Sequence, residues 1–213
     1  MSQSQTHNIY RGDLDPNKGY LCQWVYWRPD PDAPNPELPG LKQTMTTYIT
    51  VKPGDLCLCG SGLRFRDCCR ARPYWHPLCP NPDAESYSLL APQEVTFKNV
   101  NIQRVREQLM EDVRLQCVDD LGDHAFWIYW GDPALDTPPF GTLCFGDLEL
   151  KRNSTLYVTA MSDLRMQILL ALLRDVLGEE FKPTPIRYDP VTVIDKQTGK
   201  HVKLRLGKST SRS

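Results

Sequence analysis

The clearest hydrophobic pattern lies in the second half of the chain. Residues 95–100 alternate between apolar and polar positions, as a half-buried strand does. After them, apolar residues recur every three or four positions, which places them on one face of a helix. These positions are Ile102, Val105, Leu109, Val113 and Cys117. We therefore expect a strand followed by a helix that runs to Cys117.

A second strand and helix pattern follows. Residues 125–130, 141–150 and 155–159 are strand-like, and residues 162–177 have helical spacing. Ser162 or Asp163 is expected to cap this helix, and Gly178 to end it, because these residue types favour those positions. The order β-α-β-β-β-α predicts an α+β fold, with an antiparallel sheet and helices on one face.

Shorter patterns occupy both ends of the chain. Residues 20–27 and 45–51 are apolar or β-branched and predict strands, whereas residues 28–40 contain five prolines and predict a loop. A hairpin is expected from 191–194 and 201–206. We divide the chain into an aromatic and proline-rich N-terminal segment (1–52), a cysteine module (53–80), the α+β domain (84–190), and a terminal hairpin with a basic tail (191–213).

The strongest chemical signal is a set of four cysteines in two close pairs. They are Cys57, Cys59, Cys68 and Cys69, spaced as C-x-C and C-C with eight residues between the pairs. Zn²⁺ prefers a tetrahedral shell of sulfur and nitrogen ligands, and a shell of four cysteines leaves no open position for catalysis. The pattern predicts a small zinc module in which four cysteines hold structural Zn²⁺.

Other uses of these cysteines stay open, namely disulfides, iron and redox chemistry. The first ten residues are polar and lack the apolar stretch of a signal peptide, which favours a cytoplasmic location, where disulfides are rare. The C-x-x-C spacing typical of redox thiols is absent. Four further cysteines are scattered and are expected to be free thiols: Cys22, Cys79, Cys117 and Cys144.

Residues 57–69 resemble the SEC-C motif, a small zinc-binding module that ends many SecA preprotein translocases. The motif reads C-x-C-G-S-G, then a short basic and aromatic stretch, then C-C or C-H. The four cysteines fall on its ligand positions and Phe65 on its aromatic position, while Arg64 and Arg66 replace the usual lysines. In the translocases this module is associated with binding a chaperone, the ribosome and lipid. The resemblance implies a docking element for a protein partner.

Three functions are compatible with these features. The first is a non-enzymatic zinc protein whose module is structural or docks on a partner. Candidate contacts to an acidic protein face or to phosphate are Arg64, Phe65, Arg66 and Arg70.

The second function is an RNA- or ribosome-associated factor. The formal net charge is −1, yet residues 196–213 contain six Lys or Arg residues and no acid. Such a tail can engage phosphates, with a steep dependence on salt. No apolar run approaches the roughly 20 residues that span a membrane.

The third function is an enzyme with a pocket in the α+β domain near residues 123–130. Acidic residues crowd this region and could hold a divalent cation: Asp119, Asp120, Asp123, Asp132 and Asp136. No nucleotide-binding, metalloprotease or serine-hydrolase motif supports this function. We therefore expect a protein that is not an enzyme.

Overall fold

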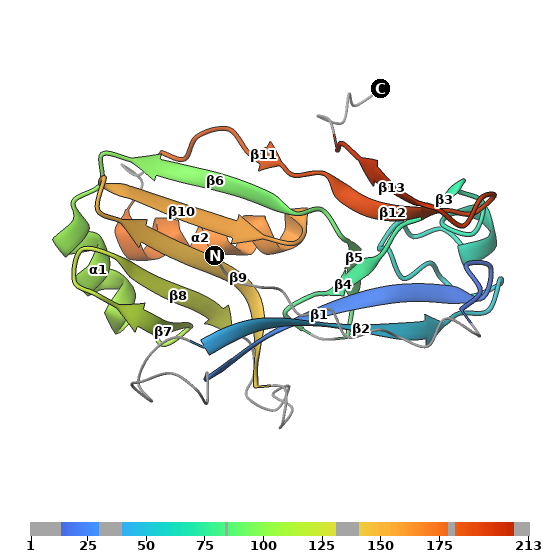
Figure 1. The fold of residues 1–213 in the computed structure, drawn as a ribbon, viewed down its shortest axis with the longest axis horizontal. Helices are drawn as coiled ribbons and strands as arrows, with labels where there is room; N and C mark the ends of the chain where they lie inside the picture. Colours follow the sequence, from blue (N-terminus) through green and yellow to red (C-terminus); the bar gives the residue numbers. More distant parts are fainter. Residues whose placement is uncertain (1–13, 30–39, 84, 131–140, 179–181, 207–213) are drawn as a thin grey trace.

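The protein has an α+β fold in which two helices cover one face of a curled, mostly antiparallel sheet (Figure 1). The computed structural model describes residues 14–29, 40–83, 85–130, 141–178 and 182–206. The elements of the helical half are β6 (Gln93–Lys98), α1 (Ile102–Glu111), β7 (Leu115–Asp120), β8 (Ala125–Trp130), β9 (Thr142–Lys151), β10 (Thr155–Ala160) and α2 (Asp163–Leu177).

These elements confirm the predicted architecture. The strands pair antiparallel in the order β6-β10-β9-β8-β7, and both helices pack on the same core. Trp127 of β8 and Leu169 of α2 are fully buried in that core. Ser162 caps α2 through its side chain, which accepts a hydrogen bond from the Arg165 N–H, and Gly178 follows the last turn with φ 94°.

The prediction of a helix reaching Cys117 was wrong. Helix α1 ends at Glu111, where Asp112 adopts an extended backbone and its carboxylate accepts bonds from the Arg114 N–H and guanidinium. These local side-chain hydrogen bonds compete with the backbone hydrogen bonds of a further helical turn, and the helix ends here. Val113 is 85% exposed, and Cys117 pairs with Trp127 in the additional strand β7.

The N-terminal segment joins the same sheet. Strands β1 (Gly19–Pro29) and β2 (Gly40–Thr50) form a long antiparallel ladder, and β1 also pairs with β9 at Trp27 and Thr142. The two strands extend into both ends of the expected loop, whose residues 30–39 lie outside the described structure. Lys42 of β2 forms an ion pair of 2.6 Å with Asp147 of β9.

Short strands complete the far end of the molecule. Strand β4 (Leu78–Pro80) pairs with β1 and with β5 (Tyr87–Leu89). The predicted terminal hairpin is confirmed as β12 (Val191–Asp195) and β13 (His201–Leu204), and β12 also pairs with β3 (Tyr74–Trp75). Strand β11 (Arg187–Tyr188) pairs with β6.

The cysteine loop (residues 51–73) lies between β2 and β3, at the end of the molecule opposite helix α1 (Figure 1). It is flanked there by the β1–β2 ladder and the terminal hairpin. None of the helices in the described ranges is long and apolar enough to cross a membrane.

Candidate metal centre

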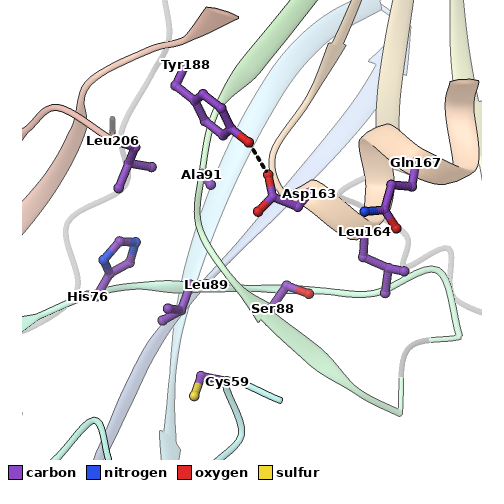
Figure 2. Close-up of a pocket in the computed structure, with 10 residues that line it drawn as sticks. All are labelled: Cys59, His76, Ser88, Leu89, Ala91, Asp163, Leu164, Gln167, Tyr188 and Leu206. Atoms are coloured by element: carbon purple, nitrogen blue, oxygen red, sulfur yellow. Dashed lines mark hydrogen bonds between the residues drawn. The ribbon is translucent and has the colours of Figure 1, made fainter. Parts of the chain in front are cut away.

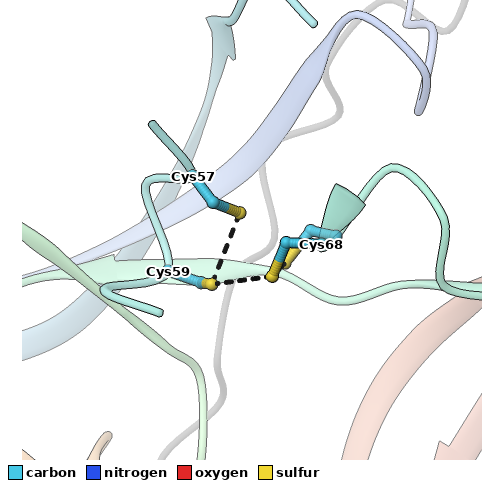
Figure 3. Close-up of side chains that lie close together, drawn as sticks. Cys57, Cys59 and Cys68 are labelled. Atoms are coloured by element: carbon cyan, nitrogen blue, oxygen red, sulfur yellow. Dashed lines mark hydrogen bonds between the residues drawn. The ribbon is translucent and has the colours of Figure 1, made fainter. Parts of the chain in front are cut away.

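The four predicted cysteines converge on one point, and Figure 3 shows Cys57, Cys59 and Cys68 pointing toward one another. The Sγ atoms of Cys57 and Cys59 lie 3.4 Å apart, those of Cys59 and Cys68 3.6 Å, and those of Cys68 and Cys69 3.9 Å. All four lie within 4.8 Å of one another. A regular tetrahedron with metal–sulfur bonds of about 2.3 Å has edges of about 3.8 Å. The three separations are close to this edge length, so the four sulfurs are near enough to one another to bind a single metal ion.

Local backbone structure brings the two pairs together. Gly60 and Gly62 have φ of 77° and 73°, a region that costs glycine little and a residue with a Cβ more. These turns let the Cys57 N–H donate to the Leu63 carbonyl oxygen at 2.8 Å. A short 3-10 helix, η1 (Phe65–Asp67), then directs Cys68 and Cys69 back toward the first pair.

The cluster is sheltered by the N-terminal strands. Cys57, Cys68 and Cys69 are buried and Cys59 is half-buried. Beneath them, Phe65 packs against Tyr20 of β1, with ring centroids 5.1 Å apart. The shared core consists of Tyr20, Cys22, Val51, Cys57, Phe65, Cys68, Cys69 and Leu78.

Two hydroxyl groups contact the sulfurs. The Tyr20 hydroxyl lies 2.7 Å from Cys57 Sγ, and the Ser61 hydroxyl lies 3.2 Å from Cys68 Sγ. Burial, with the nearby thiols, holds the pKa of Tyr20 far above its usual range, so this hydroxyl stays protonated and can donate to a thiolate at Cys57. Donors of this kind orient metal ligands and stabilise thiolates.

The thiols are electrostatically unequal without a cation. The Cys69 thiol, assisted by Ser61, lowers the pKa of the Cys59 thiol to about 4. The same contact with Cys59, together with burial, raises the pKa of Cys69, and burial raises the pKa of Cys68. A single thiolate is thus stabilised by its neighbours, whereas several buried thiolates at this spacing require a cation. This chemistry suits a metal ion.

Comparison with known families agrees with this geometry. A family model for the SEC-C motif matches residues 55–71, which contain all four cysteines. The chain therefore carries a SEC-C motif, and the match covers only this short part of it. Neither the curated proteins nor the solved structures include a significant match to the chain.

The predicted partner contacts in the motif divide into two groups. Arg64 and Arg66 are exposed, with Arg64 donating to the Gly54 carbonyl oxygen and Arg66 3.2 Å from Asp67, and Arg70 is half-buried. Phe65, however, is 1% exposed. The prediction that Phe65 is a surface contact was wrong, because its ring packs against Tyr20 beneath the cysteine loop.

Two residues that position the site carry no recognisable sequence signal. Tyr20 lies 37 residues before Cys57. Lys196, in the turn of the terminal hairpin, donates through Nζ to the carbonyl oxygens of Cys69 and Arg70, both at 2.8 Å. The Lys196 N–H also bonds to the Pro73 carbonyl oxygen at 2.9 Å. Only the folded chain brings these groups to the motif.

The remaining cysteines stand apart from the metal cluster. All are free thiols; three are buried and Cys117 is half-buried. His76, which the sequence places near the motif, is outside the cluster, and its Nε2 donates to the Leu90 carbonyl oxygen at 2.7 Å.

The acidic region of the α+β domain forms ion pairs. Asp120 pairs with Arg106, and Asp123 pairs with Arg152 at 2.9 Å. Trp127 is buried in the core. Asp132 and Asp136 lie outside the described residues. The hollow near His124, lined by that residue and residues 151–153, is open and does not contain Asp119 or Asp120.

Proposed function

We propose that this protein is a non-enzymatic zinc protein in which one Zn²⁺ stabilises the end of the fold opposite helix α1. The ion is held by Cys57, Cys59, Cys68 and Cys69. The observation that carries this proposal is the convergence of four sulfurs at separations close to those of a tetrahedral zinc site. Four thiolates are the ligand set of structural zinc sites, and they close the coordination shell. The ion would supply structure rather than catalysis.

The composition of the loop supports a structural role. Between residues 52 and 73, the buried side chains are Cys57, Phe65, Cys68 and Cys69. A segment whose only large buried apolar side chain is one phenylalanine cannot bury enough surface to offset the entropy of ordering its backbone. In such segments, the free energy of metal binding becomes free energy of folding.

The neighbours of the loop define what the metal holds in place. The buried core of the loop includes Tyr20 and Cys22 of β1, and Lys196 joins it to the terminal hairpin. Zinc would therefore keep the start of β1 and the β12–β13 turn on opposite sides of one rigid loop. This arrangement supports the structural proposal without a partner.

A docking role is a second candidate, supported by apolar side chains on the outer side of the loop. Leu56 is 68% exposed and Leu63 is 54% exposed, and Leu56 forms an isolated bridge with Arg64. Leucines beside arginines suit a protein surface better than RNA, since apolar contacts add nothing to phosphate binding. Lys196, the first residue of the basic tail, is engaged inside the protein.

The structural proposal is tested by replacing one cysteine from each pair. The Cys57→Ser, Cys68→Ser variant should contain no zinc, and its free energy of unfolding should fall by at least about 3 kcal/mol, because its loop loses the ion that orders it. Wild type and the control Cys117→Ser should each contain one zinc per chain. Zinc-free wild type with eight reactive thiols would refute the proposal.

The docking candidate needs a separate test. A photo-crosslinking amino acid at Leu63 should capture one defined protein in cells, and Leu56→Ser should abolish that product while the zinc content stays unchanged. Capture that persists in Leu56→Ser would remove the outer side of the loop as the contact surface.

A further inference from the structure

A pocket of about 470 Å³ lies beside the metal centre, between the cysteine loop and the first turn of α2 (Figure 2). Its volume falls within the range of binding sites for small ligands and peptide side chains. Six separate parts of the chain form its wall. The lining residues are Cys59, His76, Ser88, Leu89, Ala91, Asp163, Leu164, Gln167, Tyr188 and Leu206.

Asp163 is the polar centre of this pocket. Its Oδ1 accepts hydrogen bonds from the Tyr188 hydroxyl at 2.8 Å, drawn in Figure 2, and from Gln93 Nε2 at 3.0 Å. Its Oδ2 has no hydrogen-bond or ion-pair partner among the described residues, and the side chain is exposed. The carboxylate is thus held in a fixed orientation with one oxygen available.

The other polar groups also favour a donor-rich, positively charged ligand. No Lys or Arg of the described chain lines the pocket. His76 uses its Nε2 hydrogen for the Leu90 carbonyl oxygen, which leaves Nδ1 as an acceptor in the neutral ring. Ser88 donates to Asn81 Oδ1 at 2.8 Å, so its oxygen retains acceptor capacity in the pocket wall.

The strand at the base of the pocket ends its sheet. Strand β5 pairs with β4 and with no other strand of the described chain. In this ladder the N–H of Leu90 bonds to the carbonyl oxygen of Pro77. Because bonded positions alternate in antiparallel pairs, the backbone N–H and C=O of Leu89 point away from β4. These groups can pair with the main chain of an extended peptide.

We propose that this pocket binds an extended peptide segment of a partner protein through a lysine or arginine side chain. The ammonium or guanidinium group would meet Asp163 Oδ2, and the methylene stem would lie against Leu89, Leu164 and Leu206. The peptide backbone would pair with the free edge at Leu89. Charge complementarity selects a basic peptide over an acidic one.

One part of this inference rests on the proposed function. Zn²⁺ with four thiolates is an anionic centre, and Cys59 places that centre in the wall of the pocket. The bound metal would strengthen the attraction for a cationic side chain. The contribution of Asp163 does not depend on the metal, so the two proposals can fail separately.

The test uses the full chain and fluorescence anisotropy of labelled, amidated hexapeptides. The probes alternate valine with lysine, with glutamine or with glutamate. Saturable binding should rank lysine above glutamine, with no binding of the glutamate peptide. Asp163→Asn retains the size of the side chain and its acceptor for Tyr188, yet should weaken binding of the lysine peptide about tenfold, as expected for loss of a charge-assisted hydrogen bond.

Asp175→Asn is the matched control, since Asp175 lies on the same helix, is 70% exposed and does not line the pocket. It should change affinity less than twofold, and both variants should retain the wild-type metal content. Equal weakening by the two variants, absence of saturable binding to wild type, or full competition by lysine methyl ester would each overturn the proposal. Wild-type protein that contains no zinc would refute the metal centre, and the comparison between Asp163→Asn and wild type would still be valid.

Discussion

The contact between Tyr20 and Cys57 shows how one residue from a distant strand reaches the four-cysteine cluster. The hydroxyl lies 2.7 Å from the sulfur, and the ring packs on Phe65. Phenylalanine would keep this packing and remove only the hydroxyl. The comparison therefore separates support of the thiolate from support of the core.

We predict that Tyr20→Phe lowers zinc affinity by about tenfold, because hydrogen bonds to metal ligands typically contribute 10–100-fold. Competition with a chromophoric zinc chelator measures this change. The control is Tyr87→Phe, because Tyr87 packs near the same core and its hydroxyl has no hydrogen-bond partner among the described residues. Equal affinities of wild type and Tyr20→Phe would contradict the assigned role of the hydroxyl.

At the scale of residues, the sequence predicts the ligands and misses their support. Cys57 and Cys59 are recognisable from the sequence, because residues two positions apart can bring their sulfurs close together without any tertiary contact. Phe65 occupies a position typical of the motif, yet the pattern does not say whether its ring faces inward or outward. Tyr20 and Lys196 contact the motif only through tertiary structure, so no local pattern identifies them.

At the scale of elements, helix α2 rests closely on the sheet because β9 has a glycine beneath it. A Cβ atom at Gly146 would collide with Leu169 Cδ1 and lie 2.9 Å from the Thr159 carbonyl oxygen. The leucine side chain could adjust, whereas the backbone carbonyl could not. The position therefore requires glycine for packing.

We predict that Gly146→Ala lowers the free energy of unfolding by about 1–3 kcal/mol, the usual cost of overpacking a core. Urea denaturation monitored by tryptophan fluorescence gives the value. Gly54→Ala should be nearly neutral in the same assay, since a Cβ there meets no atom within 4 Å. A stability of Gly146→Ala equal to wild type would show that α2 can move away from β9 without cost.

The two helices illustrate the limits of periodicity. Residues 163–177 have a capping serine, an apolar face and a following glycine, and the structure confirms all three features. Residues 102–117 have an equally regular apolar spacing, but Asp112 and Arg114 interact locally and end the helix. Cys117 fits the helical spacing, but Leu115 and Cys117 also fit the alternating pattern of a strand. The structure places both residues in β7.

At the scale of the whole molecule, the cysteine loop joins the two ends of the described chain. Tyr20 reaches it from β1, and Lys196 reaches it from the β12–β13 turn. Lys196 and Cys69 are 127 positions apart, a separation that no sequence pattern bridges. The pocket at Asp163 has the same origin, since its walls come from separate segments.

We predict that Lys196→Met lowers the free energy of unfolding by about 1–2 kcal/mol and speeds the transfer of zinc to a chelator, because the carbonyl oxygens of Cys69 and Arg70 lose their shared donor. Lys200→Met, at an exposed position of the same turn, should change neither quantity. Identical zinc transfer rates in wild type and Lys196→Met would show that the Lys196 hydrogen bonds do not help the cysteine loop to retain zinc.

X-ray absorption spectroscopy at the zinc edge shows whether four cysteine sulfurs hold one Zn²⁺. Purified wild-type protein should give a shell of four sulfur scatterers at about 2.3 Å and one zinc per chain. Addition of a strong chelator should then remove the signal and lower the melting temperature. A coordination shell that contains nitrogen or oxygen ligands, or protein without zinc, would show that these four cysteines do not form a Zn²⁺ site.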